Sequence, residues 1–193
     1  MGMVSPSATQ KGLKDCNQIT DGEVVAINCK TVRGLYNKSE ERSAIHMVSA
    51  FSAVNQTVLG QVKTGDKTNE IKAIPELLEL LSIRGCLVTI DAMGCQKNIA
   101  NKIRDKGSDY LLAVKGNQKA LNQVFHSGML QQFDGDQYVT QEKGHGRLET
   151  RLSLVEHDMS LLGDIALEWP GLKTVGVVVS IRQEGSRPAE TCR

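Results

Sequence analysis

Aromatic side chains are scarce in this 193-residue chain and make up 4% of it. Domains that stack single-stranded bases need several exposed Phe, Tyr or Trp side chains, so the composition argues against that kind of nucleic-acid platform. A surplus of one charge is lacking too, because 23 Lys and Arg residues balance 22 Asp and Glu residues. Any nucleic-acid surface must therefore come from local clustering of basic residues.

Regularly spaced cysteines are also missing. The five cysteines are odd in number and contain no C-x-x-C pair, which argues against a disulfide scaffold and against a zinc ribbon. The longest apolar runs fall far below the roughly 20 residues that cross a bilayer, and residues 1–6 contain no apolar signal core. We therefore expect a reduced, cytoplasmic protein that does not associate with a membrane.

The hydrophobic pattern predicts an α/β domain over residues 21–185, between polar tails at 1–20 and 186–193. Its predicted order is three strands followed by alternating helices and strands. The strands are expected at 24–27, 44–53, 57–62, 86–90 and 110–114, and the helices at 68–85, 95–106 and 117–126. A β-hairpin over 138–156 and an apolar strand over 174–181 follow this core.

Asp91 is the most informative single residue, because it ends the apolar strand pattern of residues 86–90. Ligands in open α/β sheets collect beyond the carboxyl ends of buried strands, which favours a site at this acid. An Asp after a strand also commonly forms a turn or caps a helix. Position alone leaves both interpretations open.

The order of elements is that of a ribonuclease H-like mixed sheet with flanking helices and an inserted β-hairpin. In that architecture the first and fourth strands are neighbours, so Asn28 and Asp91 would face one another. Two carboxylates at such a place hold two divalent cations, which activate water or a 3′ hydroxyl for attack on a phosphodiester. Residue 28 is an amide, which offers an oxygen but no charge.

Six motifs then follow one another along the chain. They are INCKTVRG (27–34), AIHMVSAF (44–51), NEI with IPELL (69–78), TIDAMGCQ (89–96), AVKGNQ (113–118) and GHGR (144–147). In this order they resemble the H-repeat-associated, insertion-sequence (ISAs-type) family of DDE transposases, from about residue 18 to about residue 185. The resemblance implies a recombinase that cuts and rejoins double-stranded DNA at the ends of a mobile element.

The same resemblance implies an Asp, Asp, Glu triad that uses Mg²⁺ or Mn²⁺, and Asp91 matches its second Asp. The chain departs from the family at the first Asp, because family members read Ile-Asp-Gly-Lys-Thr where this chain reads INCKT from Ile27. The family's Glu normally lies beyond residue 193, and a helical region normally precedes the first strand. The resemblance therefore implies a truncated, degenerate copy whose C-terminal part is missing.

Metal binding in such a copy is expected to be weak or lost, and catalysis defective. Asp91 would be the one remaining metal ligand, and Asn28 would mark the degenerate first position. The alternative is a noncatalytic fragment that binds DNA or self-associates and so interferes with intact copies, or a relic without function.

Basic and amide side chains near the strand ends are the candidate DNA contacts, since such groups typically bind phosphates. The candidates are Lys30, Thr31, Arg33, Lys115, Asn117, Gln118, His145 and Arg147. A solvated basic loop explains the first three equally well. The hairpin alternates a charged face, residues 145, 147, 149 and 151, with an apolar face at Leu148, Leu152 and Leu154 that we expect to be core.

The remaining reactive side chains have structural interpretations. Glu70 at a helix N-terminus would stabilise the helix dipole. His46 on an apolar strand would be a core residue with a satisfied ring. The cysteines at 29, 86 and 95 would be apolar fillers and not ligands.

Overall fold

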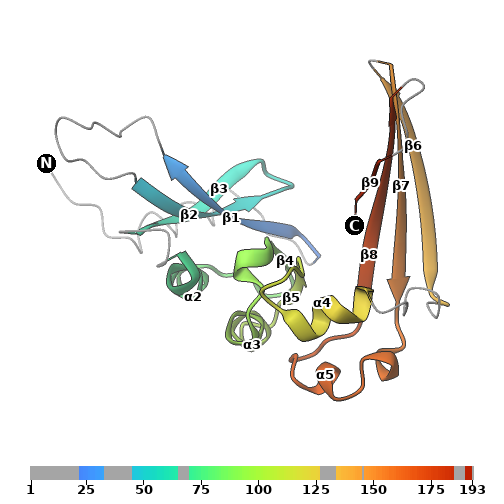
Figure 1. The fold of residues 1–193 in the computed structure, drawn as a ribbon. Helices are drawn as coiled ribbons and strands as arrows, with labels where there is room; N and C mark the ends of the chain where they lie inside the picture. The colour runs from blue at the N-terminus through green and yellow to red at the C-terminus, as the bar shows by residue number, and fades with distance from the viewer. Residues whose placement is uncertain are drawn as a thin grey trace, which may run out of the picture. The chain divides into compact units, whose positions relative to one another are not determined.

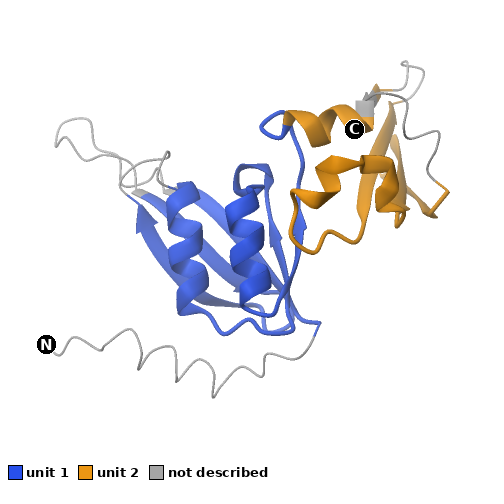
Figure 2. Ribbon diagram, turned by 90° about the horizontal axis from the view of Figure 1, so that it is seen from below, with its two compact units in different colours: residues 1–118 blue, residues 119–193 orange. Residues whose placement is uncertain are grey.

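The computed structural model describes residues 22–32, 45–64, 70–126, 134–144, 146–184 and 190–192. The chain divides into two compact units, residues 1–118 and residues 119–193 (Figure 2). The expected tail at 1–20 lies outside the described residues, and so do Arg33 and His145. None of the described helices is long and apolar enough to cross a membrane.

Unit 1 is built on a five-stranded mixed sheet with the order β3-β2-β1-β4-β5 (Figure 1). Its strands are β1 (Val24–Val32), β2 (Ile45–Ser52), β3 (Thr57–Thr64), β4 (Leu87–Ile90) and β5 (Asp109–Leu112). The first three strands form an antiparallel meander, and β4 runs parallel to both β1 and β5. The predicted order of strands is confirmed, and β1 and β4 are neighbours as expected.

Two helices, α2 (Glu70–Leu80) and α3 (Lys97–Asp105), lie side by side on one face of this sheet (Figure 2). The prediction that the first helix runs to Gly85 is wrong, because α2 ends at Leu80. The prediction that the second begins at Cys95 is also wrong, because a short 3₁₀ turn, η4 (Ala92–Gly94), comes between β4 and α3.

The core of unit 1 forms where alternate residues of the strands meet the apolar stripes of the helices. Val25 and Ile27 of β1 and Val88 and Ile90 of β4 point to the helix side and are buried. They belong to one cluster with helix residues that are fully buried, namely Ile74, Leu77, Leu78, Ile99 and Ile103. Each such side chain contributes roughly 1.5–3 kcal/mol on burial. This packing fixes the paired parts of β1 and β4, directly after which Asn28 and Asp91 lie.

Unit 2 contains a four-stranded antiparallel sheet with the order β6-β7-β8-β9. Its strands are β6 (Asp136–Gly144), β7 (Arg147–Glu156), β8 (Val175–Glu184) and β9 (Glu190–Cys192), and its helices are α4 (Lys119–His126), η6 (Met159–Leu162) and α5 (Asp164–Leu167). The predicted hairpin is confirmed. The apolar strand expected at 174–181 pairs with it along the whole of β7.

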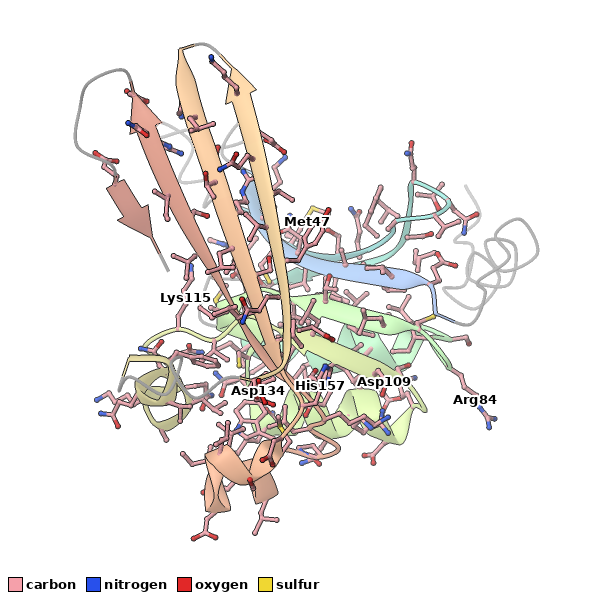
Figure 3. The ribbon with its side chains drawn as sticks, turned by 90° about the vertical axis from the view of Figure 1, so that its right-hand side faces the viewer. Met47, Arg84, Asp109, Lys115, Asp134 and His157 are labelled. Atoms are coloured by element: carbon pink, nitrogen blue, oxygen red, sulfur yellow. The ribbon has the colours of Figure 1, made fainter. Side chains whose placement is uncertain are left out.

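The carboxylate of Glu156 ties together the chain at one end of the hairpin. It is buried and accepts hydrogen bonds from the backbone N–H groups of Asp134 at 3.0 Å, His157 at 2.7 Å and Asp158 at 2.8 Å. Figure 3 shows Asp134 and His157 close together at this end of the hairpin. These hydrogen bonds, with that of Asp158 the strongest, hold the pKa of Glu156 below its usual range. The acid therefore has a structural task.

The two faces of the hairpin alternate as predicted, but the apolar face is not core. Leu148 is 36% exposed, and Leu152 and Leu154 are only partly buried, since nothing among the described residues covers them fully. On the charged face Arg151 pairs with Glu149 at 2.8 Å and with Glu142 at 3.6 Å. These ion pairs agree with the interpretation of mutually paired charges on this face.

Candidate active site at the ends of β1 and β4

The register between β1 and β4 places Asn28 and Asp91 side by side where the pairing of the two strands ends. The two strands are parallel, and their last registered pair is Ile27 with Ile90. The residues that follow this pair are Asn28, within β1, and Asp91, directly after β4. Both are exposed, whereas the two isoleucines are buried. Because neighbouring strands lie roughly 4.8 Å apart, the two polar side chains lie close together at the point where the pairing of β1 and β4 ends.

Strand β1 does not end at Asn28, which corrects the sequence expectation. It continues to Val32 by pairing with β2, from Asn28 opposite Ser49 to Val32 opposite Ile45. Asn28 and Lys30 are alternate exposed residues of this extension and share a face. Lys30 therefore lies on the same side of β1 as the candidate site. The backbone of Thr31 belongs to the extension, and its side chain is outside the described part.

Asp91 also caps the turn that follows it. Its backbone is extended, with φ −68° and ψ 176°, and its Oδ1 accepts a hydrogen bond from the backbone N–H of Met93 at 3.2 Å. The capping interpretation of the sequence is thus confirmed, and it coexists with a position at the strand end. The bond fixes the direction of the carboxylate relative to η4.

Gly94 lets this turn pack directly on the core. The residue is buried, and a Cβ built on it would lie 2.3 Å from Cγ2 of Ile90 and 3.1 Å from Cδ1 of Ile74. Any larger side chain would push the turn away from the end of β4. The close approach therefore holds Asp91 against the sheet.

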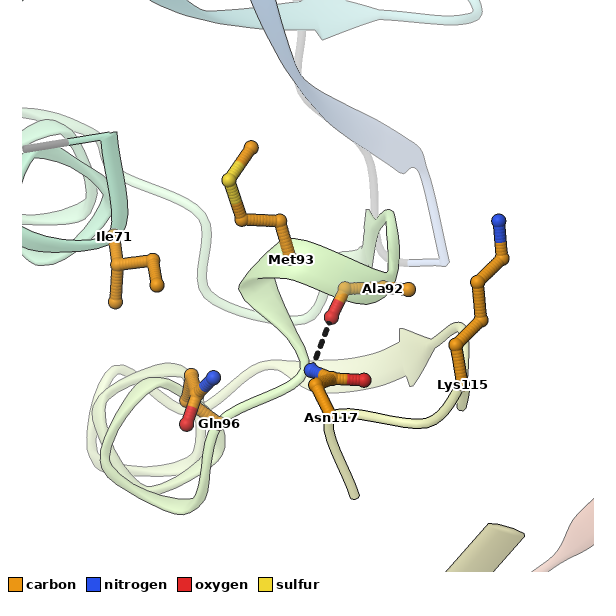
Figure 4. Close-up of a pocket in the computed structure, with 6 residues that line it drawn as sticks. All are labelled: Ile71, Ala92, Met93, Gln96, Lys115 and Asn117. Atoms are coloured by element: carbon orange, nitrogen blue, oxygen red, sulfur yellow. Dashed lines mark hydrogen bonds between the residues drawn. The ribbon is translucent and has the colours of Figure 1, made fainter. Parts of the chain in front are cut away.

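Two side-chain amides bind the turn from the segment after β5. Nδ2 of Asn117 donates to the carbonyl of Ala92 at 2.6 Å (Figure 4), and Nε2 of Gln118 donates to the carbonyl of Cys95 at 2.7 Å. Sequence reasoning proposed both amides as DNA contacts and missed this pairing. The TIDAMGCQ motif contains the two accepting carbonyls and the AVKGNQ motif contains the two donating amides. Neither motif by itself indicates the group with which it pairs.

A shallow depression of about 300 Å³ lies beside η4. Its surface is mainly apolar, and its lining residues are Ile71, Ala92, Met93, Gln96, Lys115 and Asn117 (Figure 4). Lys115 is exposed and supplies the cation at this place. The structure thus brings Lys115 to the turn that follows Asp91, as expected of residues beyond parallel strands.

Cys29 and Cys95 are protonated thiols beside the site. Burial, together with the smaller effect of the negative charges of Glu70 and Asp91, raises the pKa of Cys29 to about 11. The influence of Asp91 on the residue after Asn28 agrees with the strand register. Burial alone raises the pKa of Cys95 to about 11. Because metals and electrophiles require the thiolate, these values support the filler interpretation.

His46 and Glu70 form a buried pair that the sequence did not predict. Nδ1 of His46 lies 3.0 Å from Oε1 of Glu70, and the two side chains are 14% and 2% exposed. Glu70 is the first residue of α2, as the helix-dipole interpretation requires, and His46 has the satisfied ring expected of it. The pair attaches the start of α2 to β2.

The donor set at the strand ends does not fit a two-metal site. Asp91 supplies one carboxylate and Asn28 only a neutral amide oxygen, whereas the resemblance implies three carboxylates. Over the part of the chain that the structure describes, no three His, Cys, Asp or Glu side chains are grouped so as to hold a metal ion. Arg147 belongs to unit 2 and lies 4.0 Å from Glu184.

Comparison with known proteins identifies the family. The family model described as "Transposase DDE domain" matches residues 19–189. The chain belongs to the DDE transposase family, whose members generally use divalent metal ions.

Two curated relatives make the match more specific. The chain is 53% identical over 176 residues to "Putative transposase YncI" of Escherichia coli O157:H7, covering 89% of this chain and 45% of that protein. It is 49% identical over 174 residues to "H repeat-associated putative transposase YhhI" of Escherichia coli strain K12, covering 88% and 46%. The chain therefore spans about half the length of these relatives.

A solved structure of a piggyBac transposase synaptic complex with hairpin DNA is also similar, with a TM-score of 0.42 and 12% identity. The similarity covers 82% of this chain and 33% of that one. A similarity with this TM-score and this identity does not establish a shared fold.

Proposed function

We propose that this chain is a transposase-like protein whose strand-end site is catalytically defective. The observation that carries the proposal is the parallel register of β1 and β4, which sets Asn28 next to Asp91. The sheet order β3-β2-β1-β4-β5 and the helices on one face support a ribonuclease H-like core for unit 1. In such a core the ends of β1 and β4 are where the first two acids of the triad belong.

The chemical defect follows from the charge of the ligands. Mg²⁺ and Mn²⁺ favour hard, anionic oxygens, and two adjacent carboxylates provide two negative charges for them. Asn28 reduces this to the single charge of Asp91, while its amide oxygen is a poor bridge between two ions. We therefore expect this chain to bind the divalent ions that the family uses only weakly, and catalysis to be lost with them.

Binding to double-stranded DNA without cleavage is the second candidate function. It is favoured by two exposed cations: Lys30, which lies on β1 two residues beyond Asn28, and Lys115, which follows the carboxyl end of β5. Phosphate contacts need positive charge and no metal ligands, so loss of one carboxylate would leave them intact. Such a protein would occupy element ends and interfere with active copies.

Mn²⁺ titration of the purified chain, Asn28→Asp and Asp91→Ala tests the paired site. A second carboxylate a few ångströms from the first adds several kcal/mol of attraction to a cation even at an effective dielectric of 20, so Asn28→Asp should tighten Mn²⁺ binding at least tenfold. Asp91→Ala should abolish what the wild type retains.

Asn101→Asp is the matched control, because it adds the same charge at an exposed position of α3. It should leave the Mn²⁺ affinity of the chain unchanged within a factor of two or so. Equal affinities for the wild type and Asn28→Asp would show that positions 28 and 91 do not share an ion, and the proposed site would then be wrong.

A further inference from the structure

We propose that Asn117 and Gln118 are positioning residues that hold the turn following Asp91. The proposal rests on the proposed function only in taking Asp91 as the carboxylate of the site. It assigns a task within unit 1 to two side chains that belong to a different segment from Asp91.

The two amides donate hydrogen bonds to opposite ends of η4. Asn117 binds the carbonyl of Ala92, the first residue of the turn, and Gln118 binds the carbonyl of Cys95, the residue just after it. The two donor atoms come from consecutive residues, so one short segment after β5 reaches both ends of the turn. We call this pair of hydrogen bonds the amide clamp.

The turn needs outside support because it is short. Its internal bonds are those from Gly94 N–H to the Asp91 carbonyl at 3.1 Å and from Cys95 N–H to the Ala92 carbonyl at 3.3 Å. Short 3₁₀ segments have poor hydrogen-bond geometry and little cooperativity, so such bonds hold a loop weakly. The clamp bonds, at 2.6 and 2.7 Å, are the shorter ones and join the turn to a neighbouring strand end.

Asp91 depends on the turn for the direction of its carboxylate. Oδ1 is held by the backbone N–H of Met93, which lies inside the clamped segment. If the turn moved, this N–H would move with it and the carboxylate would lose its fixed orientation. The clamp thus acts on Asp91 through Met93 and not by direct contact.

The same bonds compete with the DNA role expected for these amides. Each clamp bond takes up one of the two N–H donors of a side-chain amide, so each amide has less donor capacity left for a phosphate. Lys115 stands apart from the clamp and is exposed (Figure 4). Of Lys115, Asn117 and Gln118, the lysine is therefore the best placed to contact phosphate, and the two amides have a task in holding the turn.

Hydrogen exchange of the backbone amides of residues 91–96 tests the clamp without any metal. Asn117→Ala and Gln118→Ala should each speed exchange in this segment roughly two- to tenfold, as expected for the loss of one hydrogen bond. Lys115→Ala, which leaves both bonds in place, should not. Unchanged exchange in both amide variants would overturn the clamp.

Mn²⁺ affinity then separates a positioning role from a merely structural one. In the Asn28→Asp background, Asn117→Ala and Gln118→Ala should weaken Mn²⁺ binding several-fold, whereas the exposed amide replacement Asn101→Ala should not. Faster exchange with unchanged Mn²⁺ affinity would overturn the positioning role. If Asn28→Asp itself binds no Mn²⁺, the proposed metal site fails, and the exchange measurement alone decides whether the clamp exists.

Discussion

Gly94→Ala should destabilise unit 1 by about 3 kcal/mol, the upper part of the range for overpacked cores. The added Cβ would lie 2.3 Å from Cγ2 of Ile90, a β-branched side chain that has few rotamers to escape into. Ile90 is itself buried at the end of β4. Relief of the clash must therefore move either the strand end or η4, and both movements displace Asp91.

Denaturant unfolding followed by far-ultraviolet circular dichroism, with hydrogen exchange of β4, measures this loss. Gly116→Ala is the matched control, because a Cβ at Gly116 meets nothing within 4 Å. The control should change the unfolding free energy by less than about 1 kcal/mol. Equal stabilities of the two variants would show that the turn is not packed as described.

Gly135→Ala should destabilise unit 2 by at least about 3 kcal/mol, because the obstacle is backbone. The added Cβ would lie 1.9 Å from the carbonyl oxygen of Val155 and 3.1 Å from Cα of Glu156. A β-strand backbone cannot rotate away as a side chain can. The substitution would therefore break the Asp136–Val155 register and disturb the hydrogen bonds of Glu156.

The single tryptophan of the chain, Trp169, gives a specific signal for this experiment. It belongs to unit 2 and is 4% exposed, so its fluorescence reports the unfolding of that unit. Gly144→Ala, at the other end of β6, meets nothing within 4 Å and should leave the midpoint almost unchanged. A similar midpoint for Gly135→Ala and Gly144→Ala would contradict the described packing of β6 on β7.

Most of the fold of unit 1 could be predicted because its signals are local. Continuous apolar runs predicted β1, β4 and β5, and the helical spacing from Ile71 to Leu81 predicted α2. The neighbouring positions of Asn28 and Asp91 followed from the order of elements alone. The extension of β1 to Val32 did not, because it depends on pairing with β2 and most of its residues are polar.

The supports of the site could not be predicted for a different reason. His46 pairs with Glu70 across 24 residues, and Asn117 pairs with Ala92 across 25, and each pairing is set only by tertiary packing. A polar side chain in the sequence shows what it can donate or accept, but not which group of the folded chain takes up that capacity. The amides after β5 therefore suggested phosphate contacts, and the partly exposed apolar face of the hairpin suggested core.

Strand cleavage tests the central claim most directly. The purified chain, with Asp91→Ala beside it, is incubated with a labelled duplex bearing an element end and with Mg²⁺ or Mn²⁺, and nicked and cut products are quantified. The defective site predicts no metal-dependent product above that of Asp91→Ala, whether or not the duplex is bound. Metal-dependent cleavage that disappears in Asp91→Ala would contradict it and show that Asn28 suffices beside Asp91.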